Sequence, residues 1–141
     1  MFRTSLLTAA ITATCLSASA ATIEFRADLS GKSEVPPTTS SGSGQLTATL
    51  DTDTKQLNYT MTYSGLSGPA TAAHFHGPAG VGANAGVAVP IDGANPASPT
   101  KGSVTLTDAQ ISDLEAGNWY ANVHTAANKG GEIRGQVTRV K

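Results

Sequence analysis

Cysteine is nearly absent from this chain: Cys15 is the only one among 141 residues. One cysteine cannot close a disulfide within the chain, and Cys15 lies in an N-terminal segment that we expect to be removed. A mature domain without disulfides depends on core burial, hydrogen bonds or a bound metal for its stability. Such a domain also has no thiolate to offer as a metal ligand or nucleophile.

Charged residues and long hydrophobic runs are scarce as well. Only 13% of the residues are charged, with nine basic and ten acidic side chains and no basic patch, so a nucleic-acid partner is not expected. No run approaches the roughly 20 apolar residues of a membrane-spanning helix. The chain has no G-x-S-x-G elbow, and the glycines of residues 77–86 do not lie between a strand and a helix. Hydrolase and nucleotide-binding functions are therefore excluded.

The first twenty residues have the features of a secretory signal peptide. Arg3 is followed by a short apolar run over residues 6–16, and the small residues Ala18-Ser19-Ala20 come next. A basic N-terminal region, an apolar central region and small residues before the cleavage site are typical of a cleaved signal peptide. We expect cleavage after Ala20, a secreted or periplasmic location, and a single mature domain over residues 21–141.

Apolar and polar residues alternate with a period of two in most of the remaining chain, as they do in half-buried strands. Met61 alternates with Leu57 and Tyr59, which favours a core position for this methionine over a role as a copper ligand. Trp119 is assigned to the core on the same grounds. Strands are predicted over residues 22–29, 45–51, 55–66, 70–76, 86–91, 103–107, 119–125 and 131–140.

Between these strands the sequence predicts loops and one helix. The loops cover residues 31–44, 77–86 and 92–102, where Gly, Pro, Ser and Asn are frequent. The helix covers residues 107–118, because Thr107 and Gln110 have the spacing of a capping box. Many short strands joined by turns predict an all-β fold: an antiparallel β-sandwich or Greek-key-like barrel of about eight strands with one short helix.

The chain has three histidines, and two of them, His74 and His76, lie two residues apart in a predicted strand. Residues i and i+2 of a strand point to the same face, so both imidazoles could bind one metal ion. His124 shares a strand face with Asn122, and it would complete a three-histidine site if the two strands meet. Three imidazole nitrogens favour copper by affinity, although geometry and supply could make the metal zinc. Histidines that only order loops are the alternative.

Two longer segments carry a family resemblance. The segments "AAHFHGPAGVGANAGVAVPI" and "GNWYANVHTAANKGGEIRGQV", together with the phrase L-x-G-x-x-E-V-P-P over residues 29–37, closely resemble the CHRD domain. This module was first named from chordin and is widespread in bacterial secreted proteins. The resemblance implies an antiparallel β domain of immunoglobulin size that works outside the cell, where another secreted protein is a candidate partner.

A fainter likeness is to copper-zinc superoxide dismutases, which also place a His-x-His pair on a strand of a β-sandwich. The chain lacks the further histidines and the aspartate of the dismutase zinc subsite. A mononuclear copper site with weak dismutase-like redox chemistry is all that this likeness implies.

Three further residues of the late segment are assigned supporting roles. Asn122 is expected to bind a neighbouring loop or to orient an imidazole. Glu132 and Arg134 share a strand face and are interpreted as structural, with an exposed pairing between them as one option. Gly130 and Gly131 are expected to supply the positive backbone angles of a tight turn.

Two classes of function remain open from the sequence. The leading hypothesis is a domain that binds copper through His74, His76 and His124, for metal sequestration, delivery or simple redox chemistry. The competing hypothesis is a metal-free extracellular interaction or structural module, and a carbohydrate or surface-adhesion module has less support. The position of His124 separates the first two, because ring nitrogens that share a metal lie within roughly 4 Å of one another.

Overall fold

The structure of the protein is a computed structural model that describes residues 21–141. The predicted signal peptide and Cys15 lie outside the described residues. The strands are β1 (Thr22–Ser30), β2 (Ser43–Asp51), β3 (Gln56–Ser64), β4 (Ala70–His76), β5 (Val87–Pro90), β6 (Thr100–Thr105), β7 (Tyr120–Thr125), β8 (Ile133–Gln136) and β9 (Thr138–Arg139). A 3-10 turn, η1 (Gly31–Ser33), follows β1, and the helix α1 (Asp108–Glu115) precedes β7.

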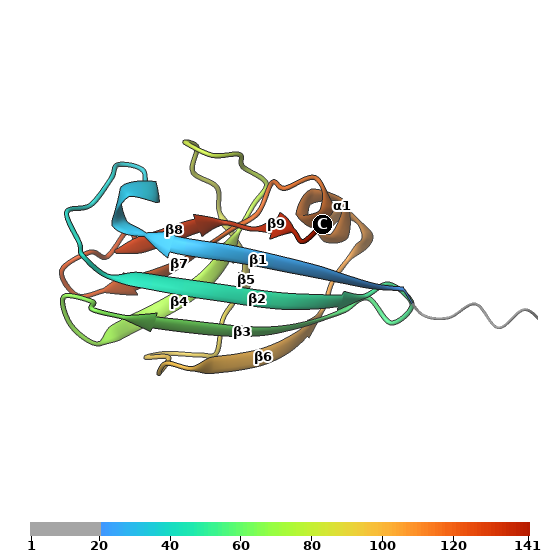
Figure 1. The fold of residues 1–141 in the computed structure, drawn as a ribbon, viewed down its shortest axis with the longest axis horizontal. Coiled ribbons are helices and arrows are strands. Elements are labelled where there is room, and N and C mark those ends of the chain that lie inside the picture. The colour runs from blue at the N-terminus through green and yellow to red at the C-terminus, as the bar shows by residue number, and fades with distance from the viewer. Residues whose placement is uncertain (1–20) are drawn as a thin grey trace, which may run out of the picture.

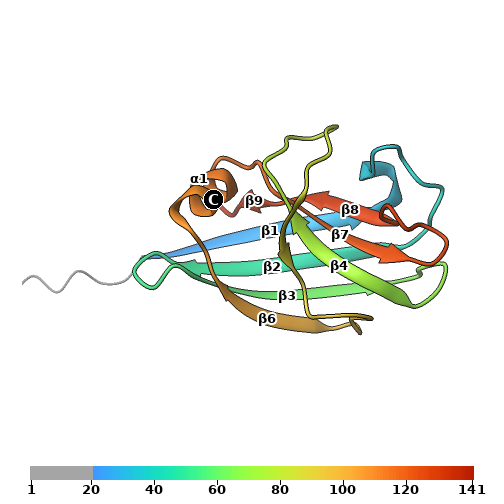
Figure 2. The ribbon, with the colours of Figure 1, turned by 180° about the vertical axis from the view of Figure 1, so that it is seen from behind.

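The strands form one antiparallel sheet in the order β5-β4-β7-β8-β1-β2-β3-β6, and the short β9 pairs with β1. The sheet curls on itself, so β4 and β7 lie behind β2 and β3 in Figure 1 and in front of them in Figure 2. The result is a half-barrel in which two parts of one sheet face each other. We call these two parts, β5-β4-β7-β8 and β1-β2-β3-β6, the wings. The predicted all-β antiparallel fold with one short helix is confirmed.

The hydrophobic core fills the space between the two wings. Met61 is 0% exposed and Trp119 is 1% exposed, so both core assignments are confirmed. The Phe75 ring of β4 contacts the Tyr59 ring of β3 edge-on at a centroid distance of 5.3 Å, which ties the wings together. Because Phe75 points into the core, its neighbours His74 and His76 point to the opposite face of the sheet.

The helix begins and ends as its sequence predicts. The Thr107 side chain accepts a hydrogen bond from the Gln110 backbone, and the Gln110 side chain accepts one from the Thr107 backbone. Leu114 is buried, which anchors the helix against the end of the half-barrel. Gly117 follows with a φ of 76°, a left-handed conformation that glycine adopts without strain.

Several element boundaries differ from the predictions by one to three residues, and two of the differences change a strand of the sheet. Strand β6 begins at Thr100, inside the predicted loop, because Lys101 and Gly102 pair with Thr60 and Tyr59 of β3. A side chain at Gly102 would place Cβ 2.2 Å from the Tyr59 hydroxyl oxygen, so this glycine makes room within a strand and marks no turn. The predicted last strand is split into β8 and β9.

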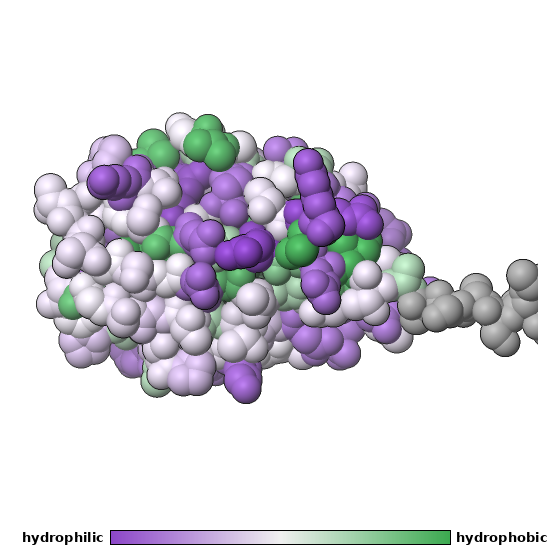
Figure 3. Space-filling model, in the orientation of Figure 1, coloured by the Kyte–Doolittle hydropathy of each residue, from purple (hydrophilic) through white to green (hydrophobic). Residues whose placement is uncertain are grey.

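The molecular surface in Figure 3 is mostly polar or neutral, and its hydrophobic areas are small and separate. Among the described residues the exposed large hydrophobic side chains are Val81, Val87 and Val140. Within residues 21–141 no helix has both the length and the apolar character needed to cross a membrane.

Candidate metal centre

Two neighbouring strands place the three histidines on one face of the sheet. In the antiparallel pair of β4 and β7, His74 lies opposite Asn122, and Ala72 lies opposite His124. His124 is therefore a diagonal neighbour of His74, and His76 follows two residues along the same face. His74 and His124 are 50 residues apart in the chain, so only the pairing of β4 with β7 brings them together.

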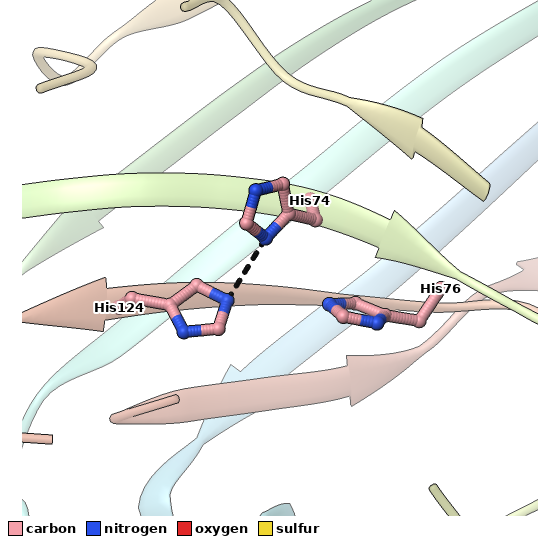
Figure 4. A group of neighbouring side chains, drawn as sticks. All are labelled: His74, His76 and His124. Carbon is pink, nitrogen blue, oxygen red and sulfur yellow. Dashed lines mark hydrogen bonds between the residues drawn. The ribbon is translucent and has the colours of Figure 1, made fainter. Parts of the chain in front are cut away.

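The ring nitrogens of the three histidines converge, as Figure 4 shows. His74 Nδ1 lies 3.0 Å from His124 Nε2, and one nitrogen from each of the three rings lies within 4.8 Å of the others. Metal–nitrogen bonds of about 2.0–2.1 Å place ligand nitrogens no more than roughly 4 Å apart. Small rotations of the rings would meet that limit, so the arrangement allows a metal site.

His76 is the most firmly held of the three rings. It stacks on Tyr120 with ring centroids 4.8 Å apart and an angle of 2° between the ring planes. Its Nδ1 lies 3.0 Å from the Ala85 carbonyl oxygen, and its Nε2 lies 3.0 Å from Asn122 Oδ1. A proton on Nδ1, donated to the carbonyl, leaves the Nε2 lone pair for the site.

The turn after β7 fixes the tautomer of His124. Its Nδ1–H donates to the Lys129 carbonyl oxygen at 2.8 Å, so the Nε2 that faces His74 carries a lone pair. That lone pair accepts the Nδ1–H of His74. A metal ion would take the place of that one proton.

Burial keeps the rings of His74 and His76 neutral. It lowers the pKa of His74 below its ordinary value of 6.5, and the neighbouring His124 and His76 rings lower it further. Burial also lowers the pKa of His76, more than its hydrogen bonds to Ala85 and Asn122 raise it. At pH 7 both rings are therefore mainly neutral, which is the form that binds metals.

Glu132 does not form the exposed pair with Arg134 that the sequence suggested. Its side chain is 0% exposed, because loops from distant parts of the chain cover it. Its carboxylate accepts five hydrogen bonds, from the Ser40 hydroxyl, the Ser67 backbone and hydroxyl, the Thr125 hydroxyl and the Asn128 amide. Burial opposes ionisation, yet these hydrogen bonds outweigh it and lower the pKa of Glu132 to about 2.

Arg134 is buried too, at 2% exposed, and holds the loop that follows β4. Its guanidinium donates to the side chain of Asn84 at 3.0 Å and to the backbone oxygens of Ala83 and Gly80 at 2.7 and 3.4 Å. It also lies 3.4 Å from the centroid of the Tyr120 ring. Both side chains bond loops of the fold, and the exposed pairing that the sequence suggested does not form.

No sequence pattern assigned a role to Glu34, which is 5% exposed and lies close to Asn122. Burial raises its pKa to about 7, against the charge of Arg134 and a hydrogen bond to Asn122. Its Oε1 is buried without a hydrogen-bond partner among the described residues. The only sequence signal was its place in the phrase over residues 29–37, an acidic residue directly before Val-Pro-Pro.

Comparison with known proteins agrees with the resemblance found in the sequence. The family model of the CHRD domain matches residues 25–137, which include all three histidines, Asn122 and Glu34. No curated protein and no solved structure matches the chain. Since the match covers most of the chain, the protein belongs to the CHRD domain family.

Proposed function

We propose that this CHRD domain binds one copper ion through His74, His76 and His124. The site would serve metal sequestration, delivery or simple redox chemistry in a secreted or periplasmic setting. The observation that carries the proposal is the convergence of three histidines from two strands, with one nitrogen of each ring within 4.8 Å of the others.

The choice of copper rests on the ligand type. Neutral imidazole nitrogens bind copper(II) more tightly than the other divalent metals of the first row. Zinc is the competing metal, since it accepts three histidines and a water in tetrahedral sites. His74 and His124 are partly exposed while His76 is buried, so a small molecule could reach the metal from one side only.

One observation favours the metal-free alternative. The rings of His74 and His124 are hydrogen-bonded to each other, and His124 also donates a hydrogen bond to the Lys129 carbonyl oxygen. This network by itself joins β4, β7 and the turn after β7. In this alternative the histidines order the surface of the sheet, and the ligand of the domain is another secreted protein.

Calorimetric titration of the metal-free domain, residues 21–141, with copper and with zinc tests the proposal. We expect one-to-one copper binding with a Kd at or below the micromolar range, and a loss of at least tenfold in His76→Ala. Asn58→Ala, at an exposed residue of β3, is the control and should bind as the wild type does. Absence of binding, or equal binding by His76→Ala, would show that the histidines are structural.

A further inference from the structure

His76 contacts two hydrogen-bond acceptors, which is one more than a neutral imidazole can satisfy. The Ala85 carbonyl oxygen lies 3.0 Å from Nδ1, and Asn122 Oδ1 lies 3.0 Å from Nε2. Neutral imidazole carries a proton on one nitrogen only. When that proton is donated to Ala85, the Nε2 lone pair and the Asn122 oxygen face each other at a distance of 3.0 Å.

Turning the Asn122 amide around does not remove this conflict. Its Nδ2 lies beside the Glu34 carboxyl, and the Asn122 amide lowers the pKa of that group. A carboxylate only accepts hydrogen bonds, so a turned amide would set its oxygen against Glu34 instead. Glu34 therefore keeps the Asn122 oxygen directed at His76.

The His76 ring stacks on Tyr120. This contact holds Nε2 in place beside Asn122 Oδ1. A metal ion held in front of both atoms satisfies the Nε2 lone pair and the amide oxygen together.

Two pairs of atoms already have the spacing of ligands around such an ion. Adjacent ligand atoms of a square arrangement with bonds of about 2.05 Å are about 2.9 Å apart. His76 Nε2 and Asn122 Oδ1 are 3.0 Å apart, and so are His74 Nδ1 and His124 Nε2. Three nitrogens and one oxygen in a tetragonal arrangement form a ligand set typical of copper(II).

We propose, building on the metal site of the previous subsection, that the carbonyl oxygen of Asn122 is the fourth ligand of the copper ion. Glu34 is the positioning residue that accepts the Asn122 amide and so directs this oxygen to the metal. Asn122 then contributes a bond to the metal, beyond the orienting role that its place in the sequence suggested.

Electron paramagnetic resonance of the copper(II)-loaded domain, with Kd values from calorimetry, tests this assignment. For the wild type we expect an axial spectrum with hyperfine coupling to three nitrogens. Asn122→Leu removes the oxygen, so it should weaken copper binding at least tenfold and shift the g and copper hyperfine values. Asn122→Asp keeps an oxygen at the same position, so its g and copper hyperfine values should stay closer to those of the wild type than the values of Asn122→Leu do. Asn58→Leu, on the exposed face of β3, is the matched control.

Variants of Glu34 test the positioning role. Glu34→Leu removes the acceptor for the Asn122 amide and should shift the spectrum in the same direction as Asn122→Leu. Glu34→Gln still offers a carbonyl oxygen to that amide and should restore the wild-type spectrum. Circular dichroism confirms folding of each variant, and Asn122→Asp serves where leucine impairs it.

The outcomes separate this inference from the proposed function. Copper binding that is lost in His76→Ala but unchanged in Kd and spectrum in Asn122→Leu overturns the fourth ligand and leaves the three-histidine site. A wild-type domain that binds no copper overturns both.

Discussion

Glu34 and Glu132 are both buried carboxyl groups, and their surroundings shift their pKa values in opposite directions. The carboxylate of Glu132 accepts five hydrogen bonds, and its pKa falls to about 2. Glu34 leaves Oε1 without a partner among the described residues, and burial raises its pKa to about 7. Hydrogen bonds to the ionised form therefore decide the outcome at each position.

Glu132 makes the free energy of unfolding of the domain depend on pH in the acid range. Its pKa is lower in the folded chain than the ordinary value of 4.5, so its contribution is complete above pH 4.5 and is lost as the pH falls toward 2. Glu132→Gln loses the charge and places amide hydrogens against hydrogen-bond donors. At pH 7 we expect Glu132→Gln to lower the free energy of unfolding by about 3 kcal/mol. This difference from the wild type should become smaller as the pH falls from 4.5 to 2.

Urea unfolding of the wild type and Glu132→Gln at several pH values measures this difference. Glu24→Gln, at an exposed position of β1, is the control and should change the free energy of unfolding by less than about 0.5 kcal/mol. A difference between Glu132→Gln and wild type that stays constant from pH 7 to pH 2 would contradict the role assigned to the carboxylate.

At the scale of elements, the turn between β7 and β8 serves both the fold and the candidate site. Its Lys129 carbonyl accepts the Nδ1–H of His124, and Gly131 has a φ of 127°. A Cβ atom at Gly131 would lie 2.3 Å from Glu34 Oε1 and 2.6 Å from Asn122 Nδ2. The sequence predicted positive angles for both glycines of the turn, but Gly131 alone has a positive φ.

The two adjacent glycines give a matched pair of substitutions. Gly131→Ala forces Cβ into the Glu34–Asn122 contact and strains the backbone, so we expect it to destabilise the domain by about 1–3 kcal/mol. In Gly130→Ala the added Cβ meets no atom within 4 Å, so its free energy of unfolding should stay within about 0.5 kcal/mol of the wild type. Chemical denaturation of both variants measures the difference. Equal free energies of unfolding of the two variants would show that the space beside Gly131 can take a Cβ atom.

On the scale of the whole molecule, loops from distant parts of the chain meet over the face of β4 and β7. Asn84 donates to the Val35 carbonyl oxygen at 2.9 Å, and the Thr38 hydroxyl donates to the Glu132 carbonyl oxygen at 2.8 Å. Arg134 holds the backbone of Ala83 at 2.7 Å. Since residues 21–141 contain no cysteine, these hydrogen bonds and the core stabilise the fold and also enclose the site.

Copper should therefore raise the thermal stability of the whole domain. A ligand that binds only the folded state at 100 times its Kd adds about 2.7 kcal/mol, which corresponds to a rise in Tm of roughly 10 °C for a domain of this size. We expect this rise for the wild type and little of it for His76→Ala, measured by differential scanning calorimetry with and without copper. A Tm that does not respond to copper would contradict binding to the folded state.

Local patterns in the chain predict the strands, the helix and which residues face the core. These features follow from local patterns: alternation of period two, a capping box and glycine at turns. His74 and His76 could be paired from sequence because two residues of one strand always share a face. The location of Met61 and Trp119 in the core followed from the same alternation, and the structure confirms it.

The residues that surround the histidine pair follow from the three-dimensional fold and from no local pattern. His124 joins the pair because β4 and β7 are neighbours in the sheet, and the order of strands is set by contacts between segments far apart in the chain. Glu34 reaches Asn122, and Arg134 reaches the loop after β4, through loops whose paths no local pattern fixes. Burial of Glu132 and Arg134 has the same origin, because the covering segments come from elsewhere in the sequence.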